Sequence, residues 1–361
     1  MTMPLRVAHL PARTPYVRKL RNHEFVSING TTLTNGHHVP DALSASWILD
    51  RRPLDWVDVV HLHHIEFEDE TVLGELLSAC DDAGVRVVHT IHDLTAMFGT
   101  TEDLHRKIQF VHEAGATLLC LTGGSATQLN RIVGEETKTW VAPHGYVVDP
   151  ETIARLDRLD SDGTSRFLMY GALRPNRDYL STLVNWALHT GAEDRLHLLM
   201  RGLSQAHMAD PGQHAMDVAR TAMTCPRIEV TMRGYPSDDD IINAGRQADV
   251  LVMPYRWGTH SGQLELAFDL GLLPLSSDVG CLRDQHAAHL RSGLVEEPEW
   301  FDWTNGNPYE FGERFVASLE NTRDRIGGSR TRADRRAWAD YRRAEHAATL
   351  AVHAEAYQAG R

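Results

Sequence analysis

The sequence has few cysteines, and none of them belongs to a closely spaced pair. Its four cysteines, Cys80, Cys120, Cys225 and Cys281, lie far apart, and three of them lie in or next to apolar runs. Disulfide frameworks need an oxidising compartment, and structural zinc sites use cysteines at short, regular spacings. We therefore predict buried, reduced thiols in a cytoplasmic protein.

Long apolar runs are missing as well. A membrane-spanning helix needs about 20 consecutive apolar residues, and no run in the chain approaches that length. The first residues, Met1 to Leu10, lack the extended apolar region of a signal peptide. The sequence therefore predicts neither a membrane span nor a signal peptide.

Positive charge is also scarce. The chain has 36 basic and 49 acidic residues, and its formal net charge is −13. Nonspecific binding to nucleic acid or to an anionic membrane requires a positively charged surface. The charge balance therefore argues against both kinds of partner, but it is compatible with a local basic pocket for a nucleotide.

Short apolar runs alternate with helical patterns along the chain, whose 361 residues favour two domains. This alternation predicts the α/β fold class, with parallel sheets that are covered by helices on both faces. The expected strands are Leu5–Leu10, Trp56–Leu62, Val85–Ile91, Ala116–Leu121, Thr139–Ala142, Arg166–Tyr170, Leu196–Met200, Arg227–Thr231, Val250–Met253 and Leu272–Ser276. The expected helices lie around 72–80 and 104–111, at Gly124–Val133, Tyr179–Leu188 and Asp238–Gln247, and within Thr331–Gln358.

A polar segment between Asp149 and Ser165 interrupts the alternation and indicates a domain boundary. The predicted domains are residues 1–155 and 165–330, each a doubly wound, Rossmann-like parallel sheet. We expect the two domains to face a cleft that binds ligands beyond the carboxyl ends of the strands. Residues 331–361 are predicted to form a helix with one apolar face, which could cross back to the first domain or mediate a homodimer.

The most informative segment is Tyr255–Gly271, which reads as a loop and a short helix between two strands. The loop brings small and polar groups to the start of the helix, where free backbone N–H groups and the helix dipole favour an anion. Glu265 lies one turn into that helix. An anion site beside a single carboxylate suits a nucleotide diphosphate next to its ribose hydroxyls. The candidate groups of the loop are His260, Ser261, Gly262 and Gln263.

A second segment, Gly171–Asp178, directly follows the first strand of the second domain. Gly171 permits a close approach of the backbone. Arg174 and Arg177, three residues apart, could both reach a diphosphate, where charge-assisted contacts are strong. A solvated turn with two surface arginines is the alternative.

These two segments resemble the donor-sugar motifs of retaining glycosyltransferases of family 4, which have the GT-B fold. Arg174 matches the arginine of the family's Gly-x-Leu/Ile-Arg-Pro-x-Lys motif, and Arg177 stands at the lysine position. Ser261-Gly262 matches a subgroup of the family. Glu265 matches the second glutamate of the family's Glu-x7-Glu motif, which implies ribose binding, but Trp257 replaces the first glutamate.

The resemblance extends to the first domain and to one further loop. His92, at the end of the strand Val85–Ile91, matches a histidine that contacts the transferred sugar or the reacting centre in the family. Tyr235 lies in the loop that packs on the nucleotide base in the family. Alternate strand residues share a face, so His61 and His63 could ligate a metal ion together. His63, His64 or Glu66 could instead bind an acceptor. We predict that no metal is bound, because no further ligand set follows.

The resulting prediction is a retaining, metal-independent glycosyltransferase. Its co-substrate would be a nucleoside-diphosphate sugar, with UDP, GDP or dTDP left open, and its acceptor would be a small molecule or a glycan. The developing charge on the diphosphate would be stabilised by the arginines and by the helix start. Two alternatives stay open: a nucleotide-sugar epimerase on the same fold, and a catalytically degenerate partner protein.

Overall fold

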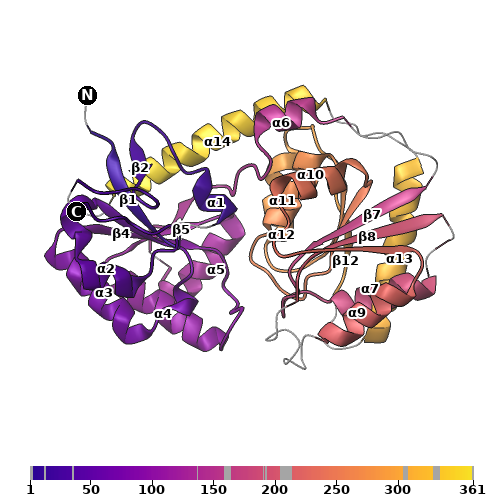
Figure 1. Ribbon diagram of the computed structural model, residues 1–361, viewed down its shortest axis with the longest axis horizontal. Coiled ribbons are helices and arrows are strands. Elements are labelled where there is room, and N and C mark those ends of the chain that lie inside the picture. Colours follow the sequence, from indigo (N-terminus) through magenta and orange to yellow (C-terminus); the bar gives the residue numbers. More distant parts are fainter. Residues whose placement is uncertain are drawn as a thin grey trace. The chain divides into compact units, whose positions relative to one another are not determined.

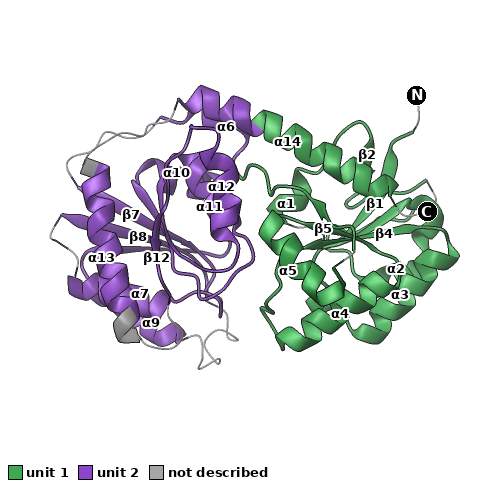
Figure 2. Ribbon diagram, turned by 180° about the vertical axis from the view of Figure 1, so that it is seen from behind, with its two compact units in different colours: residues 1–147, 343–361 green, residues 148–342 purple. Residues whose placement is uncertain are grey.

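A computed structural model describes residues 3–11, 14–34, 36–135, 137–157, 164–189, 191, 193–203, 214–303, 308–327 and 334–359. The chain forms two compact units (Figure 2). Unit 1 contains residues 1–147 and 343–361, and unit 2 contains residues 148–342. In the described part of the chain, no helix combines the length and the apolar character needed to cross a bilayer.

Each unit is built on a six-stranded sheet in which all described strand pairs are parallel (Figure 1). The strand order is β2-β1-β3-β4-β5-β6 in unit 1 and β12-β11-β10-β7-β8-β9 in unit 2. The predicted α/β class with two parallel sheets is thereby confirmed. The strands are β1 (Leu5–Leu10), β2 (Phe25–Ser27), β3 (Val59–Leu62), β4 (Arg86–Ile91), β5 (Thr117–Cys120), β6 (Trp140–Val141), β7 (Ser165–Gly171), β8 (Asp194–Arg201), β9 (Ile228–Arg233), β10 (Val250–Met253), β11 (Leu273–Ser277) and β12 (Glu299–Phe301).

Helices lie between the strands in both units. Those of unit 1 are α1 (Pro15–Arg18), α2 (Ala45–Arg51), α3 (Glu70–Asp82), α4 (Thr101–Glu113) and α5 (Gly123–Val133), with short 3₁₀ turns η1 (Pro53–Trp56) and η2 (Ile65–Phe67). Those of unit 2 are α6 (Pro150–Arg155), α7 (Tyr179–His189), α9 (Ala215–Thr224), α10 (Asp238–Arg246), α11 (Gly262–Leu270), α12 (Leu282–Leu290) and α13 (Pro308–Gly327). The last helix, α14 (Arg335–Gln358), begins in unit 2 and ends in unit 1.

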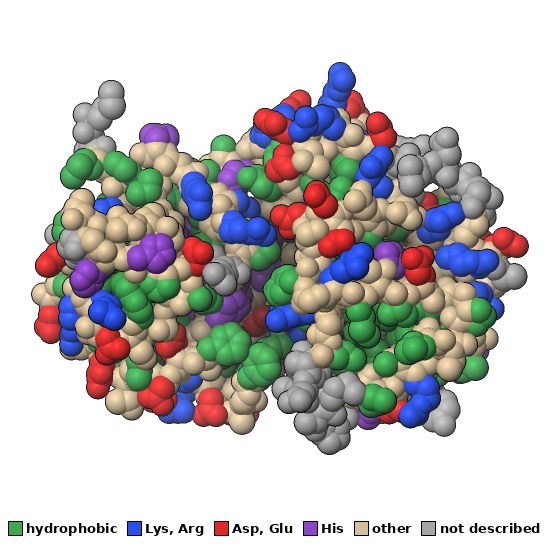
Figure 3. Space-filling view, viewed as in Figure 1, with side chains coloured by type: hydrophobic (Ala, Val, Ile, Leu, Met, Phe, Trp, Pro, Cys, Tyr) green, Lys and Arg blue, Asp and Glu red, His purple; other side chains and the backbone are tan. Residues whose placement is uncertain are grey.

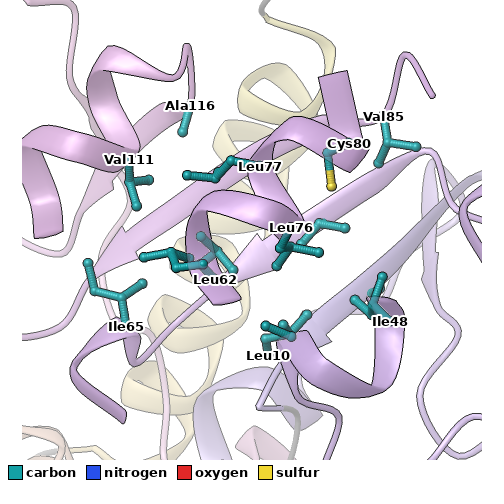
Figure 4. Close-up of a cluster of buried hydrophobic side chains, with 14 of the residues drawn as sticks. Leu10, Ile48, Leu62, Ile65, Leu76, Leu77, Cys80, Val85, Val111 and Ala116 are labelled. Carbon is teal, nitrogen blue, oxygen red and sulfur yellow. The ribbon is translucent and has the colours of Figure 1, made fainter. Parts of the chain in front are cut away.

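The sheet of unit 1 is buried on both faces. Successive strand residues point to opposite faces, so Ala8 and Val60 pack in one cluster while Val7 and Val59 pack in another. The first cluster lies under α2, α3 and α4, and Figure 4 shows part of it. The second cluster lies under α1 and the end of α14, where Tyr357 is buried. This double covering explains why the strands read as nearly continuous apolar runs.

Unit 2 has the same construction. The helices α7, α9 and α13 cover one face of the sheet through a cluster that includes Phe167, Trp186 and Phe315. The helices α10 and α11 pack against strands β7, β8, β10 and β11. All four cysteines are free and buried, as predicted.

The strand order places a topological switch point in each sheet. In unit 2 the chain runs from β7 to β8 and β9 on one side, and then returns to β10 on the other side of β7. In unit 1 the corresponding neighbours are β1 and β3. In such sheets ligands bind beyond the carboxyl ends of the two strands that flank the switch point.

One local expectation is corrected. The polar segment that begins at Asp149 was expected to interrupt the alternation of strands and helices, but its first part forms helix α6. Asp149 caps this helix by accepting a hydrogen bond from the N–H of Thr152, and Pro150 occupies the first turn. Proline is favourable at that position, since its missing N–H has no helical partner there.

Candidate functional site

The two motif segments of unit 2, distant in sequence, meet at the switch point between β7 and β10. The N–H of Asp178 donates to the carbonyl of Pro254 at 2.8 Å, and the N–H of Arg256 donates to the carbonyl of Asn176 at 2.8 Å. An isolated antiparallel bridge also joins Arg177 to Tyr255. The loop after β7 is therefore held directly against the loop after β10.

Arg177 lies at the centre of this contact. Its Nη1 donates to the carbonyl of Tyr170 at 3.1 Å and to the hydroxyl of Tyr179 at 3.3 Å, and its guanidinium lies 5.4 Å from the ring centroid of Tyr255. Gln263 also donates to the carbonyl of Tyr170. The arginine at the position of the family's lysine is thus anchored by a carbonyl near the end of β7, by a hydroxyl at the start of α7 and by one ring.

Gly171 makes room for this arrangement. Its φ is +125°, a conformation that residues with a side chain rarely adopt, and a Cβ at this position would overlap Nη1 of Arg177 and crowd Nε2 of Gln263. We therefore expect Gly171→Ala to displace Arg177 and to lower the free energy of unfolding by about 1–3 kcal/mol. Urea denaturation measures the stability, and nucleotide calorimetry measures the site.

Gly293→Ala is the matched control for that substitution. Gly293 also has a positive φ, +69°, but a Cβ there would meet nothing within 4 Å. It should therefore show backbone strain alone and leave nucleotide binding unchanged. Equal behaviour of the two variants would contradict the packing role of Gly171.

Ser261 caps helix α11, which begins at the carboxyl end of β10. Its Oγ accepts from the N–H groups of Gln263 at 3.1 Å and Leu264 at 3.3 Å, and it lies 2.7 Å from the hydroxyl of Tyr255. The N–H of Ser261 donates to Gln285. The Ser261 hydroxyl is therefore a buried cap.

Gly262 offers the available backbone donor of this turn. It is half-buried and occupies the first helical position, where an N–H has no partner within the helix. His260, also half-buried, immediately precedes the cap. The part of the helix start that can face an anion is therefore the Gly262 amide together with the helix dipole.

Glu265 lies deeper than its motif suggested. Its side chain is 2% exposed, Oε1 accepts from Gln285 at 2.7 Å, and Oε2 lies 2.8 Å from Nε2 of His289 and 3.0 Å from Nη1 of Arg342. Arg342 also pairs with Asp269 at 3.0 Å. The carboxylate therefore joins α11, α12 and α14, and contact with a ribose would require displacement of one of these partners.

The remaining donor-side residues lie at the same sheet edge. Arg174 is exposed in the loop after β7. Tyr235, in the loop after β9, is 73% exposed, and the guanidinium of Arg201 lies 4.6 Å from its ring centroid. Arg201 ends β8, so sequence reasoning could have found it as the charged residue directly after the apolar run Leu196–Met200. It adds a third cation to the edge.

His92 belongs to unit 1 and follows β4. Its Nε2 lies 3.1 Å from Nδ1 of His63, and Nε2 of His63 lies 3.1 Å from Nδ1 of His9. A neutral imidazole has one donor and one acceptor nitrogen, so each ring sets the tautomer of the next. The three histidines therefore form a hydrogen-bonded row that leads from the carboxyl edge of the sheet into its interior.

Burial keeps the interior histidines neutral. Loss of solvent lowers the pKa of His9 to about 3, assisted by the charges of His353 and Arg21, and it lowers the pKa of His61 and His63 well below the ordinary value. Tyr357 and Thr90 provide hydroxyl partners for His61 at 2.8 and 2.7 Å.

A metal ion has one possible ligand group among the described residues of this unit. His9, His61 and His63 bring ring nitrogens within 4.8 Å of one another. Hydrogen bonds to other rings and to hydroxyls already occupy these nitrogens, apart from Nε2 of His9. The absence of a bound metal stays a prediction.

The sequence matches no protein-family model and no curated protein. Several solved structures match it over nearly its whole length. A glycosyltransferase from Rickettsia africae is 12% identical, with 99% of this chain and 98% of that chain covered and a TM-score of 0.63. HepE from Anabaena, in complex with UDP, is 13% identical, with coverages of 98% and 99% and a TM-score of 0.62. A UDP-forming α,α-trehalose-phosphate synthase from Burkholderia vietnamiensis is 11% identical, with coverages of 99% and 97% and a TM-score of 0.62.

The chain has the GT-B glycosyltransferase fold. At these identities the likeness establishes the fold, and any activity has to be argued from the residues of the site. All the residues assigned to the nucleotide-sugar donor except His92 lie in unit 2, at the end of β7, on the loops after β7, β9 and β10, or at the start of α11. Sequence reasoning gave Tyr255 no role of its own, although it opens the motif segment, and it missed Gln285, which lies outside both segments. Both side chains are buried and hydrogen-bond to Ser261.

Proposed function

We propose that the chain is a glycosyltransferase that moves a sugar from a nucleoside-diphosphate sugar to an acceptor, with retention of the anomeric configuration and without a metal ion. One observation carries this proposal. The segments that resemble the donor-sugar motifs, Gly171–Asp178 and Tyr255–Glu265, meet at the switch point of the second sheet, where this class of sheet binds ligands.

Positive charge at this edge suits a diphosphate. Unit 2 contains no lysine, so arginine alone supplies its permanent cations. Arg177 has a fixed orientation through its contacts with Tyr170 and Tyr179, while Arg174 and Arg201 lie in more exposed positions. Oriented donors aimed at a leaving diphosphate stabilise the charge that develops as the glycosidic bond breaks.

We assign the other residues as follows. The Gly262 amide and the helix dipole of α11 would bind a phosphate, and Tyr235 would stack on the base. Glu265 would act as a positioning residue that orients α11 through Gln285, His289 and Arg342. His92, from unit 1, would line the transferred sugar. The leaving phosphate would accept the proton of the acceptor hydroxyl, so no second carboxylate is required.

Calorimetry with UDP, GDP and dTDP, without added metal, tests the donor site. UDP is the first choice, because one of the matching structures is a complex with UDP and another is that of a UDP-forming synthase. We expect one nucleotide to bind with micromolar affinity. Failure of all three to bind would overturn the proposal and favour a catalytically degenerate partner protein.

Substitution of the arginines localises this binding. Arg177→Ala should weaken the nucleotide's affinity by about 100-fold, because a charge-assisted donor at a phosphate contributes roughly 3 kcal/mol. Arg174→Ala should also weaken binding, while Arg177→Lys, which keeps the charge but loses the planar fork, should be intermediate. Arg220→Ala is the control, since Arg220 is an exposed residue of α9 that pairs with Asp217. Unchanged affinity in both alanine variants would exclude this edge as the diphosphate site.

A further inference from the structure

A row of four rings leads outward from His92 along the carboxyl edge of unit 1. The ring of His64 stacks on that of His92 with centroids 5.0 Å apart, Phe67 follows at 6.0 Å, and Phe98 lies 5.5 Å beyond it. We call His92, His64, Phe67 and Phe98 the ring strip. It runs from a side chain that is 9% exposed to two phenylalanines that are 62% and 55% exposed.

Phe67 and Phe98 are more exposed than is usual for phenylalanine side chains. Large apolar rings exposed side by side mark binding surfaces more often than single exposed residues do. Three segments contribute to the strip, namely the turn after β3, the 3₁₀ turn η2 and the loop after β4. Lys107, from helix α4, donates to the carbonyls of Ile65, Glu66 and Glu68. These hydrogen bonds stabilise the turn that contains Phe67. Figure 3 shows histidine and hydrophobic side chains adjoining on the surface of this unit.

The charge around the strip is negative. The segment 66–70 has four carboxylates and no basic residue, and Glu102 and Asp103 begin the helix that follows Phe98. Arg106 pairs with Glu70 and with Asp103, and Lys107 lies against the backbone of the segment. Two cations therefore stand beside six carboxylates, and the net charge is negative. Glu66 lies 3.5 Å from Nδ1 of His64, so a polar pair adjoins the strip next to His92. A phosphate or carboxylate on a bound molecule would meet these carboxylates unfavourably.

We propose that the ring strip binds the apolar ring of a hydroxylated acceptor that carries neither phosphate nor carboxylate. The exposed phenylalanines would hold the ring, and the His64–Glu66 pair would bind the hydroxyl end of the molecule next to His92. This inference rests on the proposed function, because it names the chemical class of the acceptor in the proposed sugar transfer.

The strip can be tested by ligand binding without any turnover. The probes are phenyl β-D-glucopyranoside, which has an apolar ring and hydroxyls, glucose, which lacks the ring, and glucose 6-phosphate, which lacks the ring and adds charge. We expect saturation-transfer NMR to show binding of the phenyl glucoside, mainly through its ring protons. Its affinity should exceed that of both other probes by about tenfold, the value expected for aromatic contacts of this kind.

Substitutions of the two exposed phenylalanines provide the second part of the test. The double variant Phe67→Ala/Phe98→Ala should bind the phenyl glucoside about tenfold more weakly, and it should fold, because both side chains are exposed. Leu188→Ala is the matched control, since Leu188 is a large apolar residue of α7 that is 71% exposed. Equal probe affinity in the wild type and the double variant, or stronger binding of glucose 6-phosphate, would overturn the proposal.

Two measurements separate the other outcomes. Light scattering reports the oligomeric state. If the wild type is a dimer, the double variant is a monomer and the probe affinity is unchanged, the strip is an interface between copies of the chain. That result would overturn the proposal. Nucleotide calorimetry on the same variants should show unaltered affinity. Probe binding that depends on the two phenylalanines in a protein that binds no nucleotide would uphold the strip while rejecting the transferase.

Discussion

Acidification from pH 6.5 to pH 5 is expected to destabilise unit 1 strongly, and before unit 2. Five buried histidines of unit 1 have a lowered pKa: His9, His61, His63, His89 and His353. Burial is the main cause for each of them. It brings the pKa of His9 to about 3 and the pKa of His89 and His353 to about 4.

The sign of the effect follows from proton linkage. In the unfolded chain each imidazole binds a proton as the pH falls below about 6.5. In the folded unit His9, His89 and His353 stay neutral until about pH 4 or below, and the pKa of His61 and of His63 also lies well below the ordinary value. Within that window the unfolded state binds more protons, so stability is lost as the pH falls. Each imidazole contributes up to about 1.4 kcal/mol per pH unit, and five together roughly 5 kcal/mol between pH 6 and pH 5.

Hydrogen exchange followed by mass spectrometry between pH 7.5 and pH 5, corrected for the intrinsic exchange rate, checks this prediction. Peptides from β1, β3 and β4 should lose protection first, while those from β7 and β10 should keep it. Among the described residues of unit 2, the pKa values of His197 and His286 are shifted in the same direction. His353→Gln should make the pH dependence of unit 1 shallower by about one proton. Protection of β3 that does not change over this range would contradict the prediction.

Arg342→Ala is expected to destabilise unit 2 by about 3–5 kcal/mol, because it leaves buried carboxylates without their cation. Arg342 is completely buried and lies 3.0 Å from both Glu265 and Asp269, which are themselves buried. Equilibrium urea denaturation measures the loss. Since we propose that Glu265 orients α11, nucleotide affinity should fall together with stability.

Two further variants make this test specific. Arg314→Ala removes the partner of Asp302 in a solvent-exposed pair and should change stability by about 0–1 kcal/mol. Combining Arg342→Met with Glu265→Gln and Asp269→Asn should recover much of the stability, because no unpaired charge then remains buried. A loss below about 1 kcal/mol in Arg342→Ala would show that water or rearrangement compensates the carboxylates.

Much of the fold could be predicted from local patterns. The strands β1 and β10 have the predicted bounds, and β4, β7 and α10 differ from prediction by only a residue at either end. Short apolar runs between helical patterns are sufficient for this, since period and turn chemistry are local. The edge strands β2 and β12 have three residues each and were missed, because so short a run carries no periodicity.

The placement of the candidate-site residues could be predicted in part, and their roles in binding stay predictions. The arginines, Gly171 and the start of α11 were singled out from their spacing, and the structure brings them together at one sheet edge. Glu265, which its motif assigns to a ribose, pairs with Arg342, which lies 77 positions later in the chain. No local pattern announces such a pairing, because it depends on where α14 packs.

The order of residues along the chain was therefore enough to establish two parallel α/β sheets and a cation-bearing loop after the first strand of the second sheet. Those properties follow from side-chain period, glycine and charge within a few residues of one another. The tertiary structure alone decided which polar groups are buried, which aromatic rings are exposed and which ring nitrogens of the histidines face one another. The histidine row, the Arg342 pairs and the ring strip all join segments distant in sequence, and their protonation and partners depend on burial, which only the folded chain creates.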